Sequence, residues 1–253
     1  VHPEAKVADN VVIEPFVSID KDVVIGEGTR IGSSVTILPG TRIEKNCNIF
    51  PGAVIGGIRQ DLKFQGEYTT VEIGNNTTIR EFVTVNRGTA SKGKTTVGNN
   101  CLIMAYVHIA HDCKVGNNII LGNNTQLARD VIVDDWAIIS GMTGIHQFCR
   151  IGSHVMIGGG SLVRKDVPPF IKAGREPLSY VGINSIGLRR REFTNDKIRE
   201  IQDIYRYIYQ KGLNTSQAAE IIEAEMPASP ERDEILLFVK DSKRGIIRGY
   251  FPD

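Results

Sequence analysis

Aliphatic residues recur at every sixth position from residue 7 to residue 163. The repeat is uninterrupted over residues 25–54, which read "IGEGTRIGSSVTILPGTRIEKNCNIFPGAV". The same phase runs from Val7 to Ile55, resumes from Ile73 to Val85, and continues from Val97 to Val163. Every position in this phase is Ile, Leu or Val, so the repeat reflects the fold and not a chance composition.

A small or β-branched residue follows each aliphatic position by four, as at Thr29, Val35, Ala53 and Thr125. Gly or Asn commonly fills the places between. This pattern predicts short strands, each with one large and one small inward side chain, joined by turns with unusual backbone angles. Three such strands make a triangular coil, and stacked coils pair as parallel strands about 4.8 Å apart. The sequence therefore predicts a mainly β protein built as a parallel β-helix.

The four cysteines all occupy the small inward position of the repeat: Cys47, Cys101, Cys113 and Cys149. They are widely spaced and form no C-x-x-C pair, which argues against a structural zinc site or a disulfide framework. A buried free cysteine behaves as a small hydrophobic residue. We therefore expect the cysteines to fill the core and assign them no chemistry.

Two insertions interrupt the repeat, "GGIRQDLKFQGEYTTVE" at residues 56–72 and "RGTASKGKTT" at residues 87–96. Loops that leave a regular scaffold often carry function. The repeat ends at "VRKDVPPF", where Pro168 and Pro169 oppose regular strand pairing. We expect a loop over residues 168–188.

A helical period replaces the six-residue repeat near the C-terminus. Residues 194–212, 215–226 and 229–245 predict three helices, and the first begins with capping residues and ends at a glycine. Its apolar face holds Ile198, Ile201, Ile204, Tyr205 and Ile208. We therefore expect a β-helix domain over residues 1–188 and a small helical domain over residues 189–253 that can cover the end of the β-helix.

Composition narrows the range of partners and compartments. The 253 residues are 41% hydrophobic, enough for a substantial core, and 30 Lys and Arg against 29 Asp and Glu give a net charge of +1. This balance gives no general reason to expect nucleic acid as a partner. No stretch approaches the roughly 18 apolar residues of a membrane span, and "VHPEAKVADN" lacks the apolar core of a secretory signal. We expect a cytoplasmic protein.

The stretch "HIAHDC", residues 108–113, holds candidate chemistry. Two histidines three apart, with an aspartate behind the second, fit half a zinc site, a catalytic base held by a carboxylate, or surface residues of a repetitive scaffold. His111 lies two places beyond the aliphatic Ile109, which places it on the outside of the coil where substrate can reach it. A buried structural histidine is therefore not expected.

Several motifs outside the generic repeat carry a resemblance to a known family. They are "GGIRQDLKFQGE", "IREFVTVNRGT", "HIAHDC", "GMTGIHQFC" and "GINSIGLRRREF", followed by the helical tail. Together they resemble the bacterial UDP-N-acetylglucosamine O-acyltransferases of lipid A synthesis, members of the hexapeptide-repeat acyltransferase superfamily, over nearly the whole chain. The resemblance implies a left-handed β-helix and a homotrimer with active sites between neighbouring prisms.

The reaction that the resemblance implies is transfer of an (R)-3-hydroxyacyl chain from acyl carrier protein to the 3-hydroxyl of UDP-N-acetylglucosamine, the first step of lipid A biosynthesis. No cofactor or metal is implied, since the donor carries its own 4'-phosphopantetheine. His111 corresponds to the general base and Asp112 to the carboxylate that fixes its tautomer. The backbone N–H of Arg129 corresponds to the oxyanion donor, which in the family normally belongs to a glycine.

The resemblance also assigns substrate-binding residues. Asp61 and Lys63 of "QDLK" would contact the acyl hydroxyl and the sugar, Asn184 and Arg190 the nucleotide, and Gly159 would set the acyl-chain length by leaving room for a long chain. The remaining assigned residues are Gln60, His108, His146 and Gln147, of which the last three would line the acceptor or pantetheine path. Arg189 and Arg191 fit a nucleotide contact or a carrier-docking patch equally. Asp130, Asn86 and Ile186 depart from the family, which has histidine, histidine and glutamate there.

Three other interpretations remain open on the sequence. A zinc hydratase like the trimeric γ-class carbonic anhydrases would use His108, His111 and His146, although it would not require "QDLK" or "GLRRR". The related N-acyltransferases of the same pathway carry an additional N-terminal uridine-binding domain, whereas the repeat here starts at Val7. A non-catalytic scaffold predicts regular outward threonine rows without clustered His, Asp and Lys. Outward apolar residues such as Tyr106 and Trp136 support oligomer formation only indirectly.

Overall fold

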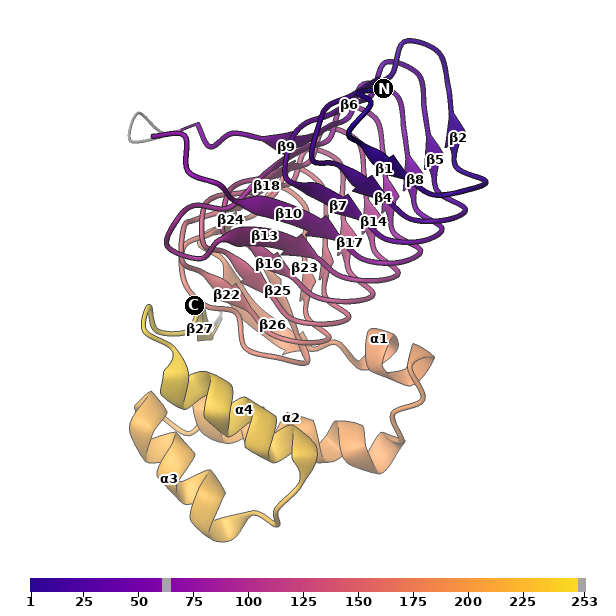
Figure 1. Cartoon of the computed structure of the whole chain (residues 1–253). Helices are drawn as coiled ribbons and strands as arrows, with labels where there is room; N and C mark the ends of the chain where they lie inside the picture. Colours follow the sequence, from indigo (N-terminus) through magenta and orange to yellow (C-terminus); the bar gives the residue numbers. More distant parts are fainter. Residues whose placement is uncertain (61–64, 250–253) are drawn as a thin grey trace.

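The computed structural model describes residues 1–60 and 65–249. Residues 1–163 form a triangular prism of stacked coils whose three faces are parallel sheets (Figure 1). Sheet 1 contains β1 (Lys6–Val7), β4 (Val24–Ile25), β7 (Thr41–Ile43), β10 (Thr70–Ile73), β13 (Lys94–Val97), β16 (Lys114–Val115), β19 (Ile132–Val133) and β22 (Arg150–Ile151).

The other two faces continue the same coils. Sheet 2 contains β2 (Val12–Ile13), β5 (Arg30–Ile31), β8 (Asn48–Ile49), β11 (Thr78–Ile79), β14 (Leu102–Ile103), β17 (Ile120–Leu121), β20 (Ile138–Ile139) and β23 (Met156–Ile157). Sheet 3 contains β3 (Ser18–Ile19), β6 (Thr36–Ile37), β9 (Val54–Gly57), β12 (Thr84–Asn86), β15 (His108–Ile109), β18 (Gln126–Leu127), β21 (Gly144–Ile145) and β24 (Leu162–Val163).

The repeat positions account for the core. The aliphatic residue of each coil strand points inward and stacks on its counterparts in register, as Ile109 does between Val85 and Leu127. Val7 and Ile13 are only partly buried because they belong to the first coil, which has a neighbour on one side only. Stacking therefore buries a continuous hydrophobic column, which is the main source of stability in a solenoid.

The small inward positions are equally buried. All four cysteines are free and buried, so the prediction that they fill the core is confirmed. Burial raises the pKa of Cys101 to about 11 and that of Cys113 to about 12. These thiols are therefore protonated at neutral pH and poor nucleophiles.

Corners of the prism require positive φ, which explains the Asn and Gly residues of the repeat. Asn76, Asn100 and Asn118 have φ between +56° and +57°. Asparagine tolerates this left-handed region better than most residues because its short side chain can hydrogen-bond locally. Asp112 also occupies such a corner, at φ +64°.

The prediction of a loop over residues 168–188 is wrong. β25 (Ile171–Gly174) pairs in parallel with β23 and extends sheet 2, β26 (Ser179–Ile183) turns back antiparallel to β25, and β27 (Arg248–Gly249) pairs with β26. α1 (Ser185–Arg190) follows directly. The prolines do end the six-residue repeat. From Ile171 onward, however, the chain again pairs in parallel with β23, and no local sequence pattern predicts this pairing.

The three predicted helices are confirmed as α2 (Asn195–Gln210), α3 (Thr215–Glu225) and α4 (Pro230–Asp241). Each begins at a side chain that accepts a backbone N–H, namely Thr194, Asn214 and Ser229. The whole predicted apolar face of α2 is buried. The Tyr205 hydroxyl donates to the carbonyl of Pro169 at 2.7 Å, which fastens α2 to the last coil.

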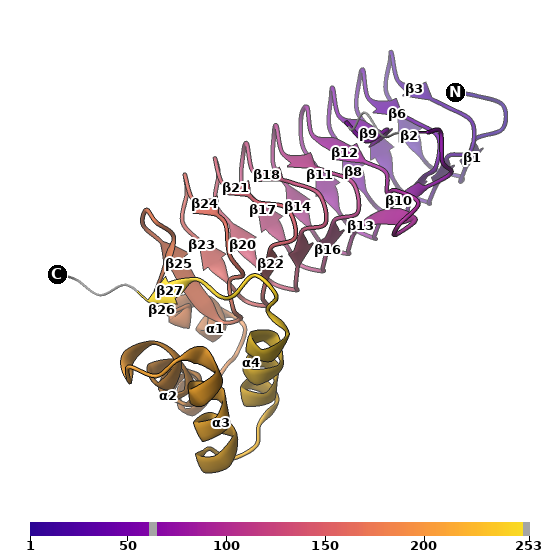
Figure 2. The same cartoon turned by 90° about the vertical axis from the view of Figure 1, so that its left-hand side faces the viewer.

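The helices lie against the C-terminal end of the prism, opposite the N-terminus (Figure 2). Residues 58–60 and 65–69 of the first insertion leave the prism between β9 and β10 (Figure 1), whereas residues 87–93 stay close to it, since Arg87 N–H donates to Gly57 and Gly88 N–H to Thr70. No helix within the described ranges is long and apolar enough to cross a membrane.

Candidate active site

His111 and Asp112 form the turn that follows β15, at the corner where the chain passes from sheet 3 to sheet 1. The His111 Nδ1 atom lies 2.9 Å from Asp112 Oδ2. The backbone N–H of Asp112 donates to Thr95 Oγ1 at 2.8 Å, which fixes the turn from inside the coil. The two adjacent residues are thereby held as a histidine–carboxylate pair.

The protonation of this pair follows from its hydrogen bonds. Burial raises the pKa of Asp112, but hydrogen bonds from His111 and from Thr89 outweigh it and leave the pKa below its usual range. An ionised carboxylate only accepts hydrogen bonds, so Nδ1 of His111 carries the proton that it donates. Nε2 then carries a lone pair, and it has no hydrogen-bond partner among the described residues. The arrangement leaves one basic nitrogen available for proton transfer.

A short segment covers the pair, and we call it the strap, residues 87–93. The backbone N–H of Thr89 donates to Asp112 Oδ1 at 2.8 Å, and its hydroxyl donates to Asp112 Oδ2 at 2.7 Å. No sequence pattern singles out Thr89, because it belongs to an insertion without periodicity. The expectation that His111 is not buried is wrong: the residue faces out of the coil, but the strap covers it and its side chain is only 10% exposed.

Arg129 and Asp130 occupy the same corner one coil further on. The Arg129 backbone N–H has no hydrogen-bond partner within the described part of the chain, so it is available as a donor. Arg129 does not adopt positive φ, which explains why an arginine can stand where the family resemblance expects glycine. Its side chain turns away, because Nε donates to Gln147 Oε1 at 2.8 Å and the guanidinium lies over the Phe148 ring.

Asp130 pairs with the strap. Lys92 Nζ lies 3.3 Å from Asp130 Oδ1, and the Asp130 backbone N–H donates to the His111 carbonyl. The carboxylate side chain is 14% exposed and the ammonium side chain 48% exposed. A second carboxylate therefore lies next to the histidine pair, neutralised by a lysine that the sequence analysis did not single out.

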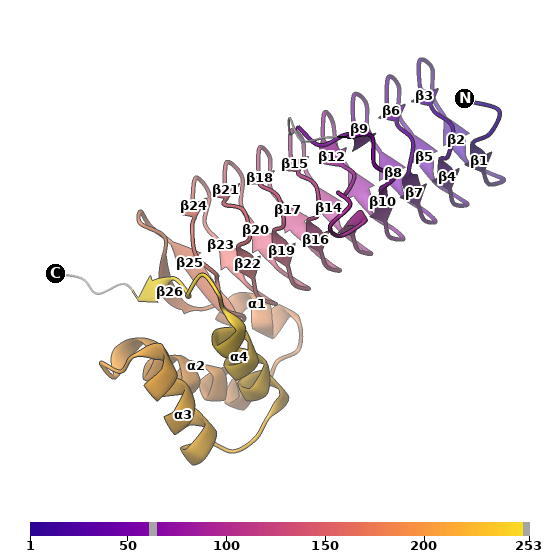
Figure 3. The same cartoon turned by 60° about the vertical axis from the view of Figure 1, so that its left-hand side comes forward.

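A groove of about 430 Å³ runs along sheet 3 from His108 past Gly144 to Leu162 and Arg164. The strands that carry it, β15, β18, β21 and β24, follow one another along the prism toward the helical end (Figure 3). Its centre is open because Gly144 has no side chain, and a Cβ there would meet only Leu162 within 4 Å. His108 Nδ1 lies 2.7 Å from Thr84 Oγ1, and burial, with a smaller contribution from His111, lowers the His108 pKa. His108 is thus neutral at pH 7. The groove is long, mostly apolar and polar at the end nearest His111.

Comparison with known proteins identifies the family. The chain is similar to the solved UDP-N-acetylglucosamine acyltransferase from Bacteroides fragilis, with 58% identity, a TM-score of 0.96, and coverage of 98% of this chain and 97% of that one. For the enzyme from Francisella novicida the identity is 44%, the TM-score 0.95, and the coverage 98% and 91%. The curated acyl-(acyl-carrier-protein)–UDP-N-acetylglucosamine O-acyltransferase of Burkholderia orbicola is 44% identical over 201 residues, 78% of this chain and 77% of that protein.

The chain belongs to the UDP-N-acetylglucosamine O-acyltransferase family. A model described as Udp N-acetylglucosamine O-acyltransferase, domain 2, matches residues 166–247, and one for the bacterial transferase hexapeptide (six repeats) matches residues 94–129. A model of the GMPPB C-terminal domain matches residues 1–89. The predicted fold, a left-handed parallel β-helix followed by a small helical domain, is confirmed.

Asn184 has a structural position in this acyltransferase. Its Oδ1 caps α1 by accepting from Gly187 N–H at 3.3 Å, its Nδ2 donates to the His154 carbonyl at 2.9 Å, and the residue is 2% exposed. Both ends of the amide are therefore used within the chain. Asn184 holds α1 in place, and its contact with the nucleotide stays a prediction.

The three arginines at the end of α1 differ in their surroundings. Arg190 is exposed, and no described residue partners its guanidinium. Arg189 Nε donates to Asn195 Oδ1 at 3.2 Å. Arg191 donates to the Trp136 carbonyl at 3.0 Å and lies over the Trp136 ring, so it packs the domain junction and covers that outward tryptophan. Only Arg190 has its guanidinium wholly available to a ligand.

Gly159 does not share a corner with His111, although the two have the same phase in the repeat. Gly159 lies between β23 and β24, at the corner of sheets 2 and 3, whereas His111 lies at the corner of sheets 3 and 1. A shared phase in the repeat therefore does not bring Gly159 beside His111 within one chain, and its role in setting acyl-chain length stays a prediction. Gly159 is exposed at the opposite edge of the face that carries the groove.

The remaining predicted residues are placed as follows. Gln60 is exposed on the first insertion, while Asp61 and Lys63 lie outside the described residues. His146 is exposed at the groove, with Nδ1 3.1 Å from the Gln147 carbonyl. Asn86 is buried against Gly57, and Ile186 is exposed on α1. The structure thus brings His108, His111, Asp112, Arg129, His146 and Gln147 together along one edge of sheet 3.

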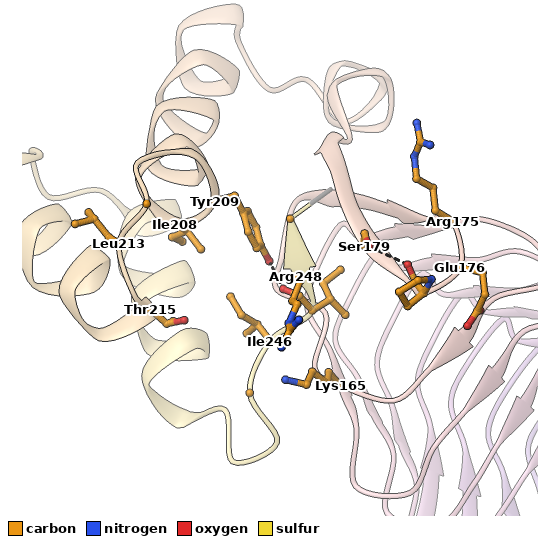
Figure 4. A pocket seen from close by; sticks show the side chains of 15 residues that line it. Lys165, Arg175, Glu176, Ser179, Ile208, Tyr209, Leu213, Thr215, Ile246 and Arg248 are labelled. Carbon is orange, nitrogen blue, oxygen red and sulfur yellow. Dashed lines mark hydrogen bonds between the residues drawn. The ribbon is translucent and has the colours of Figure 1, made fainter. Parts of the chain in front are cut away.

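Two further features lie apart from this cluster. Within the ranges that the structure describes, no three His, Cys, Asp or Glu side chains converge as a metal site, so His108, His111 and His146 do not form one within a chain. A cavity of about 850 Å³ lies between the last coil, α2 and β27, and Lys165, Tyr209 and Arg248 approach it (Figure 4). No described residue of the predicted site lines that cavity.

Proposed function

We propose that the chain transfers a 3-hydroxyacyl group from acyl carrier protein to the 3-hydroxyl of UDP-N-acetylglucosamine, the first step of lipid A biosynthesis. The observation that carries this proposal is the His111–Asp112 pair, whose Nδ1 is engaged by the carboxylate and whose Nε2 is unoccupied. The names of the relatives support the donor and the acceptor. A histidine base beside an open apolar groove suits attack of a sugar hydroxyl on an acyl thioester.

In the proposed reaction, His111 first accepts a proton from the sugar hydroxyl and then gives a proton to the leaving thiolate. His111 Nε2 takes the proton of the sugar hydroxyl as its oxygen forms a bond to the thioester carbonyl carbon. Asp112 stabilises the imidazolium, and the Arg129 backbone N–H donates to the carbonyl oxygen as it becomes negatively charged. The carbon–sulfur bond then breaks, and the pantetheine thiolate takes the proton from His111. The products are the 3-O-acyl nucleotide sugar and the free carrier thiol, and no metal or cofactor is required.

The substrates are proposed to lie along sheet 3. His108, His146 and Gln147 line the path of the acceptor or of the pantetheine, and the apolar groove past Gly144 takes a flexible chain. Gln60, with Asp61 and Lys63 beside it in the sequence, is proposed to contact the sugar and the acyl hydroxyl. Arg190 offers a guanidinium to the diphosphate or the uracil, since it is exposed and the α1 that carries it is capped by Asn184.

We also infer that the enzyme works as a homotrimer with active sites between prisms. Exposed apolar side chains follow the corner of sheets 2 and 3: Phe16, Phe82, Tyr106 and Met142 are 89%, 52%, 54% and 74% exposed. An apolar row of this kind is typical of a surface covered by another chain. Light scattering should give three times the chain mass of 27.9 kDa, and a mass of one chain would refute the inference.

The four free thiols suit the reducing cytoplasm, where we place the reaction.

The direct test is product formation from defined substrates. Purified protein is incubated with (R)-3-hydroxyacyl carrier protein and UDP-N-acetylglucosamine, and mass spectrometry follows the acylated nucleotide sugar, with UDP-glucose as the control acceptor. We expect the 3-O-acyl product from the first acceptor, with a rate unchanged by a metal chelator. Loss of activity on chelation, restored by zinc, would favour the hydratase-like metal site instead.

A further inference from the structure

The strap contacts the active-site corner at two points, and the second has no part in the mechanism described so far. Thr89 holds Asp112, and Lys92 forms the 3.3 Å ion pair with Asp130. The strap is rigid between them, because the Lys92 and Gly93 backbone N–H groups both donate to the Thr89 carbonyl. Lys92 is therefore positioned by the same turn that positions Thr89.

Asp130 lies where an unpaired negative charge would oppose catalysis. Its backbone N–H donates to the His111 carbonyl, and its neighbour Arg129 supplies the candidate oxyanion donor. A bare carboxylate there would stabilise the imidazolium form of His111 and oppose the negative charge that develops on the thioester oxygen. The site already holds one carboxylate, Asp112, which the base needs. A second one is harmless only when it is neutralised.

Stability does not account for the pair. Ion pairs with an exposed lysine contribute little to folding, because solvent screens them, and the Lys92 side chain is 48% exposed. Among the described residues, the charged and titratable groups around the His111 corner include Asp112 in the same turn, His108 on β15, Asp130 in the next coil and Lys92 in the strap. Arg129 belongs to the same corner, but its guanidinium is turned toward Gln147 and Phe148.

We propose that Lys92 is a positioning residue for the electrostatics of the acyl transfer: it neutralises Asp130, so that the base and the oxyanion donor act beside one unpaired carboxylate and not two. This proposal rests on the proposed function. It explains why an aspartate is tolerated at position 130, next to the base.

The test compares pH–rate profiles of the wild type and three variants. Lys92→Met should lower kcat by about threefold to tenfold even at the alkaline plateau and move the acid limb up by about half a pH unit or more, since the bare carboxylate favours the imidazolium. Lys92→Met combined with Asp130→Asn removes both charges and should return the limb and kcat to within about twofold of the wild type. Lys94→Met, which breaks the exposed Lys94–Glu72 pair at the edge of the strap, is the matched control and should leave the profile unchanged.

Two results would overturn the proposal. One is a Lys92→Met profile that coincides with the wild type, and the other is a double variant that keeps the full defect of the single variant. An NMR titration of the His111 ring in the same proteins gives a readout independent of turnover. It should show the Lys92→Met curve at higher pH than the wild-type curve, so failure of this inference can be told apart from failure of the proposed reaction.

Discussion

Thr89 positions Asp112 and thereby His111, although no sequence motif identifies it. It donates two hydrogen bonds to Asp112, and its hydroxyl oxygen also accepts from Ser91 N–H at 3.3 Å. His111 and Asp112 could be predicted because they form a local motif with a fixed phase in the repeat. Thr89 and Lys92 could not, because their contacts arise where a non-periodic insertion folds back across the next coil. The path of such a loop is set by tertiary hydrogen bonds that no spacing encodes.

Replacing Thr89 should therefore weaken the base without weakening substrate binding. Thr89→Val keeps the shape and the backbone donor but removes the hydroxyl, and a hydrogen bond to a charged group contributes about 1.5–3 kcal/mol. We expect kcat to fall by about tenfold with KM nearly unchanged, whereas Thr89→Ser should keep most of the activity. Steady-state kinetics of the two variants decide this, and a valine variant within twofold of the wild type would show that the hydroxyl does not orient Asp112.

Gly159 is proposed to permit a long acyl chain, about fourteen carbons or more, because each buried methylene contributes roughly 0.8 kcal/mol. A Cβ at Gly159 would lie 3.3 Å from the Gly141 carbonyl oxygen, which a small shift can accommodate. We expect Gly159→Met to slow long donors and to leave short-donor turnover within a few fold. Competition between donors of different length in one reaction measures this. Equal loss for all lengths would indicate backbone damage and remove Gly159 as the determinant.

At the scale of elements, local sequence patterns predicted the helices α2, α3 and α4. They did not predict β25 and β26, which form by pairing with residues distant in the sequence. The apolar faces and the N-terminal caps of α2, α3 and α4 each lie within one contiguous stretch of sequence, so these helices could be predicted. β25 and β26 could not, because Ile171–Gly174 becomes a strand by pairing with β23 and with the returning chain. α1 was missed as well, since its six residues are too few for a helical period to appear.

α1 matters because it presents Arg190. Its cap, Asn184, fixes the start of the helix, and the last turn exposes the guanidinium. Arg190→Ala should raise the KM for UDP-N-acetylglucosamine by about tenfold and leave kcat nearly unchanged, as expected for a contact made equally in ground and transition states. Initial-rate kinetics with each substrate varied in turn measure this. A change confined to the KM for acyl carrier protein would assign Arg190 to carrier docking.

The whole molecule is a rigid column whose regularity places the active residues. Coils stack in register, so residues eighteen apart in the sequence, such as His111 and Arg129, occupy one corner in successive coils. The repeat predicted this column, including the buried cysteines. The spacing does not determine the handedness or the oligomeric state, which only the family resemblance implied. The six-residue phase also does not say which of three corners a residue such as Gly159 occupies.

The central claim is that His111 is the general base of acyl transfer, and single-turnover kinetics test it most directly. His111→Ala should reduce the rate of the chemical step by about 100-fold or more, the scale of a lost general base, while carrier binding stays close to the wild type. The fold should be kept, because His111 lies outside the stacked core and Thr89 still donates two hydrogen bonds to Asp112. A variant that forms the acylated nucleotide sugar at nearly the wild-type rate would contradict the account.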